Sequence, residues 1–231
     1  MDRQLLSSKG EAIHLNLKSD SIISHWSDAS NHADTILQMF NNGEYKPFLS
    51  DMKDATIVDL GANIGLFSLY AHDAATKIIA VEPTPSHFEK LRELTSGYSN
   101  IELVQAAVHS ADEEVTFYCN DDNSTMNSTA NLYGNILTVK GLKLSTILKD
   151  VDHVDFCKVD IEGSEVIAIT SDVITELYDK IDAWHVTVHA AQGSSIEYWA
   201  KYFSEMFNNA GYMVSSPNNY DAIYATKTIS I

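Results

Sequence analysis

The stretch that decides the fold is Val58-Asp59-Leu60-Gly61-Ala62-Asn63-Ile64-Gly65-Leu66-Phe67-Ser68-Leu69. The segment from Thr56 to Leu60 is mostly apolar, with β-branched residues at Thr56, Ile57 and Val58, which predicts a short buried strand. Apolar residues recur at helical spacing from Ile64 to Ala71, which predicts a helix. Glycines in the turn between them let the backbone bend sharply and let a ligand approach closely. The stretch therefore predicts a strand–turn–helix unit that binds a nucleotide-like cofactor.

The turn departs from the dinucleotide fingerprint G-x-G-x-x-G. It has the form D-x-G-x-N-x-G, with Asn63 where a second glycine is expected. The carboxylate of Asp59 would repel a pyrophosphate and attract the ammonium group or sulfonium of S-adenosylmethionine. We therefore expect S-adenosylmethionine rather than a nicotinamide cofactor. An ordinary tight turn with a surface aspartate is the structural alternative.

A second strand with an acidic end follows in Lys77-Ile78-Ile79-Ala80-Val81-Glu82-Pro83. Glu82 lies 21 residues after Gly61, the distance at which nucleotide-binding units place an acid on the ribose hydroxyls. A third strand is expected from Ile101 to Val108. Its Gln105-Ala106 segment would face the adenine, either through a hydrogen bond from Gln105 or as a small apolar wall.

Two further strands carry the candidate catalytic residues. The segment from Val154 to Asp160 predicts a fourth strand, on which alternation places Lys158 and Asp160 on one side. An apolar strand buries a lysine only with a partner, and Asp160 or a carboxylate in the following turn would supply it. A fifth strand is expected from Trp184 to His189. His189 is the first candidate for a general base and Asp160 the second, the alternatives being a packed histidine and a structural aspartate.

Three stretches make the chain resemble the FkbM-type S-adenosylmethionine-dependent O-methyltransferases. They are 58–65, Val81-Glu82-Pro83 and Lys158-Val159-Asp160-Ile161-Glu162-Gly163-Ser164-Glu165. The resemblance covers roughly residues 55–190. It implies a class I, Rossmann-like α/β fold with a seven-stranded, mostly parallel sheet of order 3-2-1-4-5-7-6 and helices on both faces.

The resemblance also implies roles for individual residues. It places the methionine part of the cofactor on the glycine turn, the ribose on Glu82 and the reacting methyl beside Asp160. The expected catalytic residues are His189, Asp160 and Lys158. The expected cofactor-binding residues are Asp59, Gly61, Ala62, Asn63, Gly65, Glu82, Pro83, Gln105, Ala106 and Asp160. Family members often carry a glutamate two residues before the histidine of strand five, where this chain has Thr187.

A divalent metal is a further hypothesis for the acidic turn. Asp160, Glu162 and Glu165 offer oxygen ligands of the kind that hard cations prefer. Three acids in so short a segment are more typical of the charged start of a helix. We therefore expect no metal.

Composition limits the partners. The 231 residues hold 32 acids and 15 bases, a net charge of −17, which argues against nucleic acid and anionic membrane surfaces. No signal peptide and no apolar stretch of membrane-spanning length is evident, and Cys119 and Cys157 lie in apolar segments. These features predict a cytoplasmic protein whose partner is a small molecule or a glycan, with the oligomeric state open.

The chain divides into an N-terminal extension, residues 1–50, and a methyltransferase domain, residues 51–231. The extension is expected to hold a helix from Asn31 to Asn42, either as a cap over the site or as a packing or dimerisation arm. The polar tract from Asn120 to Thr129 predicts a loop, mobile at the mouth of the site or simply on the surface. A hairpin is expected at the end of the chain, with strands Tyr212–Ser215 and Ala222–Thr226.

Together these features predict an S-adenosylmethionine-dependent methyltransferase that modifies a hydroxyl of a small molecule or sugar. A non-catalytic cofactor-binding module of the same fold is the alternative, because the glutamate before His189 is absent. A nicotinamide-dependent oxidoreductase is a further alternative. It is disfavoured by the missing glycine and by the lack of a Tyr-x-x-x-Lys pair, since Tyr198 and Lys201 have the wrong spacing.

Overall fold

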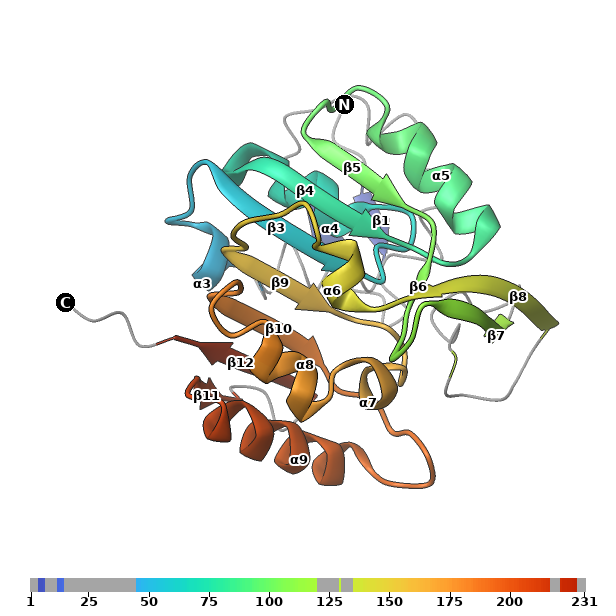
Figure 1. The fold of residues 1–231 in the computed structure, drawn as a ribbon. Helices are drawn as coiled ribbons and strands as arrows, with labels where there is room; N and C mark the ends of the chain where they lie inside the picture. Colours follow the sequence, from blue (N-terminus) through green and yellow to red (C-terminus); the bar gives the residue numbers. More distant parts are fainter. Residues whose placement is uncertain are drawn as a thin grey trace.

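The computed structural model describes residues 4–6, 12–14, 45–119, 129, 135–216 and 221–227. Seven strands build the central sheet (Figure 1). Their bounds are β3 Ala55–Leu60, β4 Ala75–Val81, β5 Ile101–Val104, β9 Phe156–Val159, β10 Ala183–Thr187, β11 Met213–Ser215 and β12 Ala222–Thr226. The order across the sheet is β11-β12-β10-β9-β3-β4-β5.

The sheet is mostly parallel. Strands β5, β4, β3, β9 and β10 run in one direction, and β12 is antiparallel to both β10 and β11. Numbered among themselves, the seven strands run 3-2-1-4-5-7-6 from β5 to β11. Numbered along the whole chain the order differs, because further strands lie between β5 and β9 in the sequence. The closing pair β11–β12 confirms the expected terminal hairpin, although the turn residues lie outside the described part of the chain.

A separate three-stranded sheet contains these further strands. They are β6 Ala107–Val108, β7 Glu113–Cys119 and β8 Asn135–Leu142, in the order β6-β8-β7. Figure 1 shows this sheet on the side toward which the arrowheads of β3, β4 and β9 point. The expected single strand from Ile101 to Val108 is therefore wrong. The chain leaves the central sheet after Val104, and Ala107 pairs with Gly141 instead.

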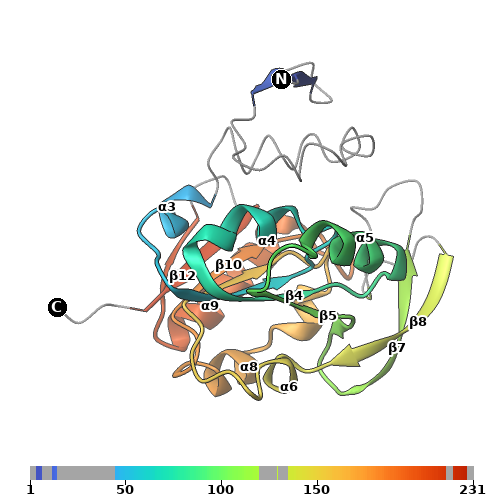
Figure 2. The same ribbon diagram turned by 90° about the horizontal axis from the view of Figure 1, so that it is seen from above.

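Helices cover both faces of the central sheet. Their bounds are α3 Lys46–Leu49, α4 Leu66–Ala71, α5 Pro85–Thr95, α6 Leu144–Ile147, α7 Glu165–Ala168, α8 Ser171–Glu176 and α9 Ile196–Asn209, with a 3₁₀ turn η3 at His72–Ala74. Figure 2 shows α3, α4 and α5 on one face and α6, α8 and α9 on the other. No helix in the described residues has both the length and the apolar character needed to cross a bilayer.

The alternation of side chains along the strands divides the core in two. Val58 and Leu60 face the larger core, which lies between the sheet and helices α8 and α9. The largest side chains of this core include Trp184 and Phe203. Ile57 faces the smaller core beneath α3 and α4. Parallel strands covered on both faces are apolar on both sides, which is why these segments read as continuous apolar runs in the sequence.

Some expected element boundaries are corrected. The helix after the glycine turn begins at Leu66 rather than Ile64. The N-cap of α9 is Ser195, whose hydroxyl accepts a hydrogen bond from the Tyr198 N–H. Strand β10 ends at Thr187, so His189 lies two residues beyond it.

Little of the N-terminal extension falls within the described residues. Strands β1 Gln4–Leu6 and β2 Ala12–His14 form an antiparallel pair. The helix expected from Asn31 to Asn42 lies outside the described part of the chain. The expected polar loop does too, apart from Thr129.

Candidate functional site

The carboxyl ends of β3 and β9 are joined by a buried ion pair. Asp59 and Lys158 are register partners on the two strands, and Lys158 Nζ lies 3.0 Å from Asp59 Oδ1. The other oxygen, Oδ2, accepts a hydrogen bond from the Ser68 hydroxyl of α4 at 2.8 Å. Asp59 is fully buried and Lys158 is 5% exposed. Lys158 also lies 3.8 Å from Asp160 Oδ2, so the nearest partner of Lys158 is Asp59 and the expected Asp160 is the second.

The glycine turn lies directly against the segment that follows β9. Gly61 has a φ of +77°, and a Cβ at this position would overlap the backbone carbonyl oxygen of Asp160. The N–H groups of Gly61 and Ala62 both donate to the carbonyl of Val81 at the end of β4, at 3.0 and 2.9 Å. Only glycine fits at position 61, because a side chain would separate the turn from Asp160.

Glu82, at the end of β4, accepts a hydrogen bond from the same turn. Its Oε2 accepts from the Asn63 N–H and its Oε1 from the Thr84 N–H, both at 2.9 Å. His87 Nδ1 lies 3.6 Å from Oε1, and the Glu82 residue is 5% exposed. A carboxylate has about four lone-pair positions, so two hydrogen bonds leave acceptor capacity for hydroxyl groups.

An acid–histidine cluster lies beyond the carboxyl ends of β9 and β10. The Nε2 atom of His189 is 3.7 Å from Asp160 Oδ1 and 3.4 Å from Glu162 Oε2. All three residues are partly buried. Glu162 has a φ of +55°, in the left-handed region that non-glycine residues seldom adopt.

Glu165, at the start of α7, contacts His189 on the side of the ring that faces away from Asp160 and Glu162. Its Oε1 accepts from the backbone N–H of His189 at 2.9 Å and lies 3.0 Å from His189 Nδ1. Its Oε2 accepts from the Gly163 N–H at 2.8 Å, and the residue is fully buried. The imidazole is therefore fixed with Nδ1 toward Glu165 and Nε2 toward Asp160 and Glu162.

The cluster raises the pKa values of His189 and Glu162. Burial disfavours the charged imidazole, but the hydrogen bond to Glu165 and the charges of Glu165, Asp160 and Glu162 outweigh it and raise the pKa of His189 to about 9. Burial raises the pKa of Glu162 to about 8, opposed by His189 and assisted by Asp160 and Glu165.

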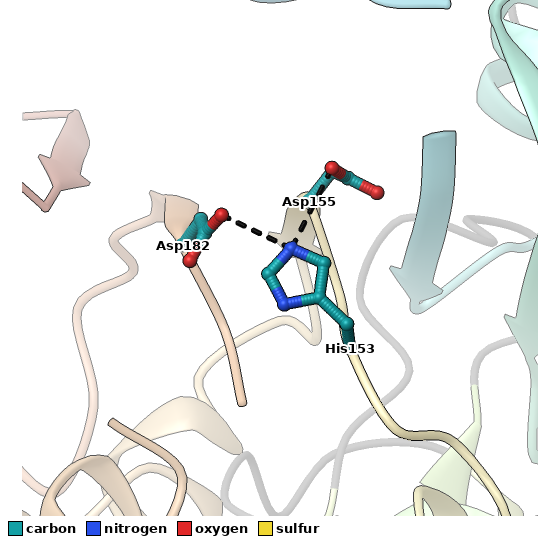
Figure 3. Close-up of side chains that lie close together, drawn as sticks. All are labelled: His153, Asp155 and Asp182. Carbon is teal, nitrogen blue, oxygen red and sulfur yellow. Dashed lines mark ion pairs between the residues drawn. The ribbon is translucent and has the colours of Figure 1, made fainter. Parts of the chain in front are cut away.

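A second set of the same residue types lies at the opposite ends of β9 and β10 (Figure 3). His153 Nε2 is 3.0 Å from Asp182 Oδ2 and 3.6 Å from Asp155 Oδ1. The remaining oxygens are engaged by Lys227 Nζ at 2.9 Å from Asp182 Oδ1 and by the Thr56 N–H at 2.7 Å from Asp155 Oδ2. Ligands of open α/β sheets bind at the carboxyl ends of the strands, so this set lies away from the expected site.

The sequence model of the methyltransferase FkbM domain family matches residues 59–214. This range runs from Asp59, through the glycine turn and the acid–histidine cluster, to β11. The chain belongs to the FkbM methyltransferase family. S-adenosyl-L-methionine is the expected cofactor. No curated protein matches the sequence of this FkbM methyltransferase.

Solved structures share its fold at low sequence identity. Aeropyrum pernix fibrillarin in complex with S-adenosyl-L-methionine has a TM-score of 0.51 and 13% identity, over 97% of this chain and 82% of that chain. Precorrin 8W decarboxylase of Methanobacterium thermoautotrophicum has a TM-score of 0.51 and 12% identity, over 82% and 90%.

The FkbM methyltransferase brings most of the predicted site residues to one edge of the sheet. Gly61, Asn63, Glu82, Asp160 and His189 lie at the carboxyl ends of the parallel strands or in the segments that follow them. The other predicted cofactor-binding residues differ in their exposure to solvent. Pro83 is partly buried, Gln105 is exposed, and Ala62, Gly65 and Ala106 are buried.

Asp59 is the predicted residue whose surroundings differ most from the expectation. Its carboxylate was expected to approach the ligand, but it is fully buried and both of its oxygens are engaged. It acts on the turn through Lys158, whose Nζ also donates to the carbonyl of Gly61 at 3.3 Å. Sequence reasoning missed Ser68, the second partner of Asp59, although Ser68 carries a hydroxyl in the middle of an otherwise apolar segment.

Proposed function

We propose that this FkbM methyltransferase transfers a methyl group from S-adenosyl-L-methionine to a hydroxyl of a small molecule or sugar. The observation that carries the proposal is the contact between Gly61 and the backbone of Asp160. It makes the cofactor turn and the acid–histidine cluster one continuous site. A methyl donor held on the turn would lie beside groups able to receive a hydroxyl proton.

The residues fit the cofactor in charge and hydrogen-bonding capacity. Glu82 keeps acceptor capacity for the two ribose hydroxyls while it holds the turn through Asn63. The carboxylate of Asp160 offers negative charge to a cationic donor. S-adenosyl-L-methionine supplies a methyl group already activated on a sulfonium, so the protein contributes chiefly position.

The acceptor hydroxyl must lose its proton during transfer. Asp160 and His189 are the proposed groups for that task, because they lie at the carboxyl ends of β9 and β10 and belong to one cluster. Asp160 is the proposed acceptor near neutral pH, since the pKa of His189 is raised to about 9 and its imidazole can take a proton only at alkaline pH. Lys158 is proposed as a positioning residue, since it is buried between Asp59 and Asp160.

The non-catalytic alternative depended on the missing glutamate before His189. Thr187 occupies that position, but Glu165 supplies a carboxylate to His189 from α7 instead. The histidine is thus oriented as an active site requires, which favours catalysis over binding alone.

The net charge of the chain bears on the class of acceptor. The chain has 32 acids and 15 bases, whereas phosphate backbones bind to clusters of basic residues, so we propose a small molecule or glycan rather than nucleic acid. Both cysteines are buried, which fits a reducing, cytoplasmic location.

The cofactor is tested by calorimetric titration of the full chain with S-adenosylhomocysteine, NAD and NADP. We expect micromolar binding of S-adenosylhomocysteine alone, weakened at least tenfold, about 1.4 kcal/mol, by Glu82→Ala. Glu89→Ala is the matched control, because Glu89 is exposed on α5 and pairs with Arg92 of the same helix. Binding of NAD, or equal affinity in the Glu82 and Glu89 variants, would contradict the cofactor site.

Catalysis is tested separately, by release of S-adenosylhomocysteine in the presence of hydroxylated small molecules and sugars. We expect turnover with at least one acceptor, and its loss in Asp160→Asn with cofactor affinity retained. Binding without turnover across a broad set of hydroxylated acceptors would favour the non-catalytic module.

A further inference from the structure

The acidic turn by itself predicts no metal, but with His189 added to it we propose that Asp160, Glu162 and His189 bind a divalent cation at the carboxyl ends of β9 and β10. Its role, holding the oxygen of the acceptor near the cofactor turn, rests on the proposed methyltransferase function. The binding itself rests only on the donor atoms. Two carboxylate oxygens and one imidazole nitrogen suit a first-row divalent metal such as Mn²⁺, which accepts oxygen and nitrogen ligands together.

The donor atoms converge on one point. Each residue offers one ligand atom, and the three atoms lie within 4.8 Å of one another. Nε2 of His189 is 3.4 Å from Glu162 Oε2 and 3.7 Å from Asp160 Oδ1. Bonds of about 2.0–2.2 Å to a common ion separate neighbouring ligand atoms by about 3–3.5 Å. These two distances from Nε2 are therefore close to those of a coordinated set.

The surroundings of His189 match those of a metal-binding histidine. Such histidines donate the ring N–H that faces away from the metal to a carboxylate, which fixes the tautomer and aims the other nitrogen. Oε1 of Glu165 lies 3.0 Å from Nδ1 and accepts from the backbone N–H at 2.9 Å. Glu165 is fully buried and its second oxygen is held by the Gly163 N–H, so it is rigid behind the ring.

The charge around the cluster favours an added cation of two positive charges. Asp59, Asp160, Glu162 and Glu165 bring four carboxylates to the ends of β3 and β9. The bases among these four acids are Lys158, which is paired with Asp59 and lies 3.8 Å from Asp160, and His189, so the acids outnumber the bases. A bound divalent ion reduces the repulsion between Asp160 and Glu162, which share the same imidazole partner. Three protein ligands leave coordination positions for water or an acceptor oxygen.

The set of His153, Asp155 and Asp182 provides an internal comparison (Figure 3). It has the same kinds of donor, but its side chains are 47%, 39% and 46% exposed. Asp182 is already neutralised by Lys227, at 2.9 Å, and none of the described contacts gives His153 a carboxylate on its other nitrogen. We expect this set to bind the cation far more weakly.

The test is a titration of the full chain with Mn²⁺, in the absence of cofactor and acceptor, followed by the loss of the electron paramagnetic resonance signal of free Mn²⁺. We expect one tight site in the wild type. Asp160→Asn and His189→Gln each weaken it at least tenfold. Glu165→Gln weakens it about 10- to 100-fold while leaving all three ligands in place. The matched controls His153→Gln and Asp182→Asn keep wild-type affinity.

Two outcomes overturn the proposal. One is a wild type that binds no Mn²⁺ below millimolar concentration. The other is loss of binding in the His153 control with retention in His189→Gln. Circular dichroism verifies folding, and Glu162→Gln gives a third ligand variant if Asp160→Asn does not fold. S-adenosylhomocysteine binding, measured on the same preparations, separates the two proposals: cofactor binding without Mn²⁺ rejects only the metal site, and Mn²⁺ binding without the cofactor rejects only the proposed function.

Discussion

Lys158 and Asp59 face each other across β9 and β3, with Nζ 3.0 Å from Oδ1, and neither side chain is more than 6% exposed. Lys158→Met leaves the carboxylate of Asp59 buried, with the Ser68 hydroxyl as its remaining side-chain partner among the described residues. We expect the free energy of unfolding to fall by about 3–5 kcal/mol, because an uncompensated buried charge is costly. Urea denaturation of the wild type and the variant measures the change.

The control for this prediction is an exposed ion pair on the neighbouring strand. Lys77 Nζ is 3.0 Å from Glu102, with side chains 40% and 59% exposed. Lys77→Met should change the free energy of unfolding by no more than about 1 kcal/mol. Equal changes in the free energy of unfolding for the two lysine substitutions would show that burial of the Lys158–Asp59 pair does not increase the cost of removing its lysine.

Gly61→Ala tests the contact between the glycine turn and Asp160. The added Cβ meets the carbonyl oxygen of Asp160 and also requires a left-handed backbone, at φ +77°. Gly193→Ala is the matched control, because Gly193 has the same φ of +77° and nothing lies within 4 Å of the point that its Cβ would occupy. We expect Gly193→Ala to lower the free energy of unfolding by about 1–2 kcal/mol, and Gly61→Ala to lower it by clearly more.

Cofactor affinity distinguishes the same two variants. The Gly61 substitution should weaken S-adenosylhomocysteine binding at least tenfold, because it pushes the turn away from β9. If the two alanine variants show the same fall in the free energy of unfolding and the same affinity for S-adenosylhomocysteine, the contact with Asp160 contributes to neither stability nor binding.

Glu165→Gln removes the charge behind His189 but keeps the shape of the side chain. The amide of glutamine has one acceptor oxygen, so it cannot satisfy the N–H groups of both His189 and Gly163 as the carboxylate does. We expect the free energy of unfolding to fall by about 1–3 kcal/mol, the cost of a buried donor left without an acceptor. Thermal denaturation measures it, with Glu176→Gln, exposed on α8, as the control that should leave the midpoint unchanged.

Cys157 should be inert toward thiol reagents in the folded protein. Burial is the main cause that raises the pKa of its thiol far above the ordinary value, so the reactive thiolate is absent at neutral and mildly alkaline pH. In a Cys119→Ala background, a chromogenic disulfide reagent should detect no thiol in native buffer and one in denaturant. Rapid labelling of the native protein at pH 8 would contradict this burial.

The local parts of the site could be predicted from sequence. Gly61 and Glu82 each follow an apolar strand, at the spacing that a strand–turn–helix–strand unit requires. The acidic segment after Val159 was likewise identifiable, because its residues follow a strand directly. These features depend only on neighbours along the chain.

The pairings between distant segments could not be predicted in this way. The strand expected from Ile101 to Val108 breaks because Ala107 pairs with Gly141, which lies far along the sequence. Asp59 looked ligand-facing because the sequence does not reveal that Lys158 is its register partner on β9. The carboxylate that contacts His189 likewise comes from Glu165 of α7. The sequence of strand five alone shows only Thr187 at the position where a glutamate is expected.

The contact between Gly61 and the Asp160 carbonyl has an evolutionary consequence. The two segments lie almost a hundred positions apart in the sequence, yet neither can change its backbone path without the other. A relative that carries a side chain at position 61 must also have rebuilt the segment after β9. Substitutions in the two segments should therefore appear together across lineages, and new acceptor preferences should arise in parts of the chain that leave this contact intact.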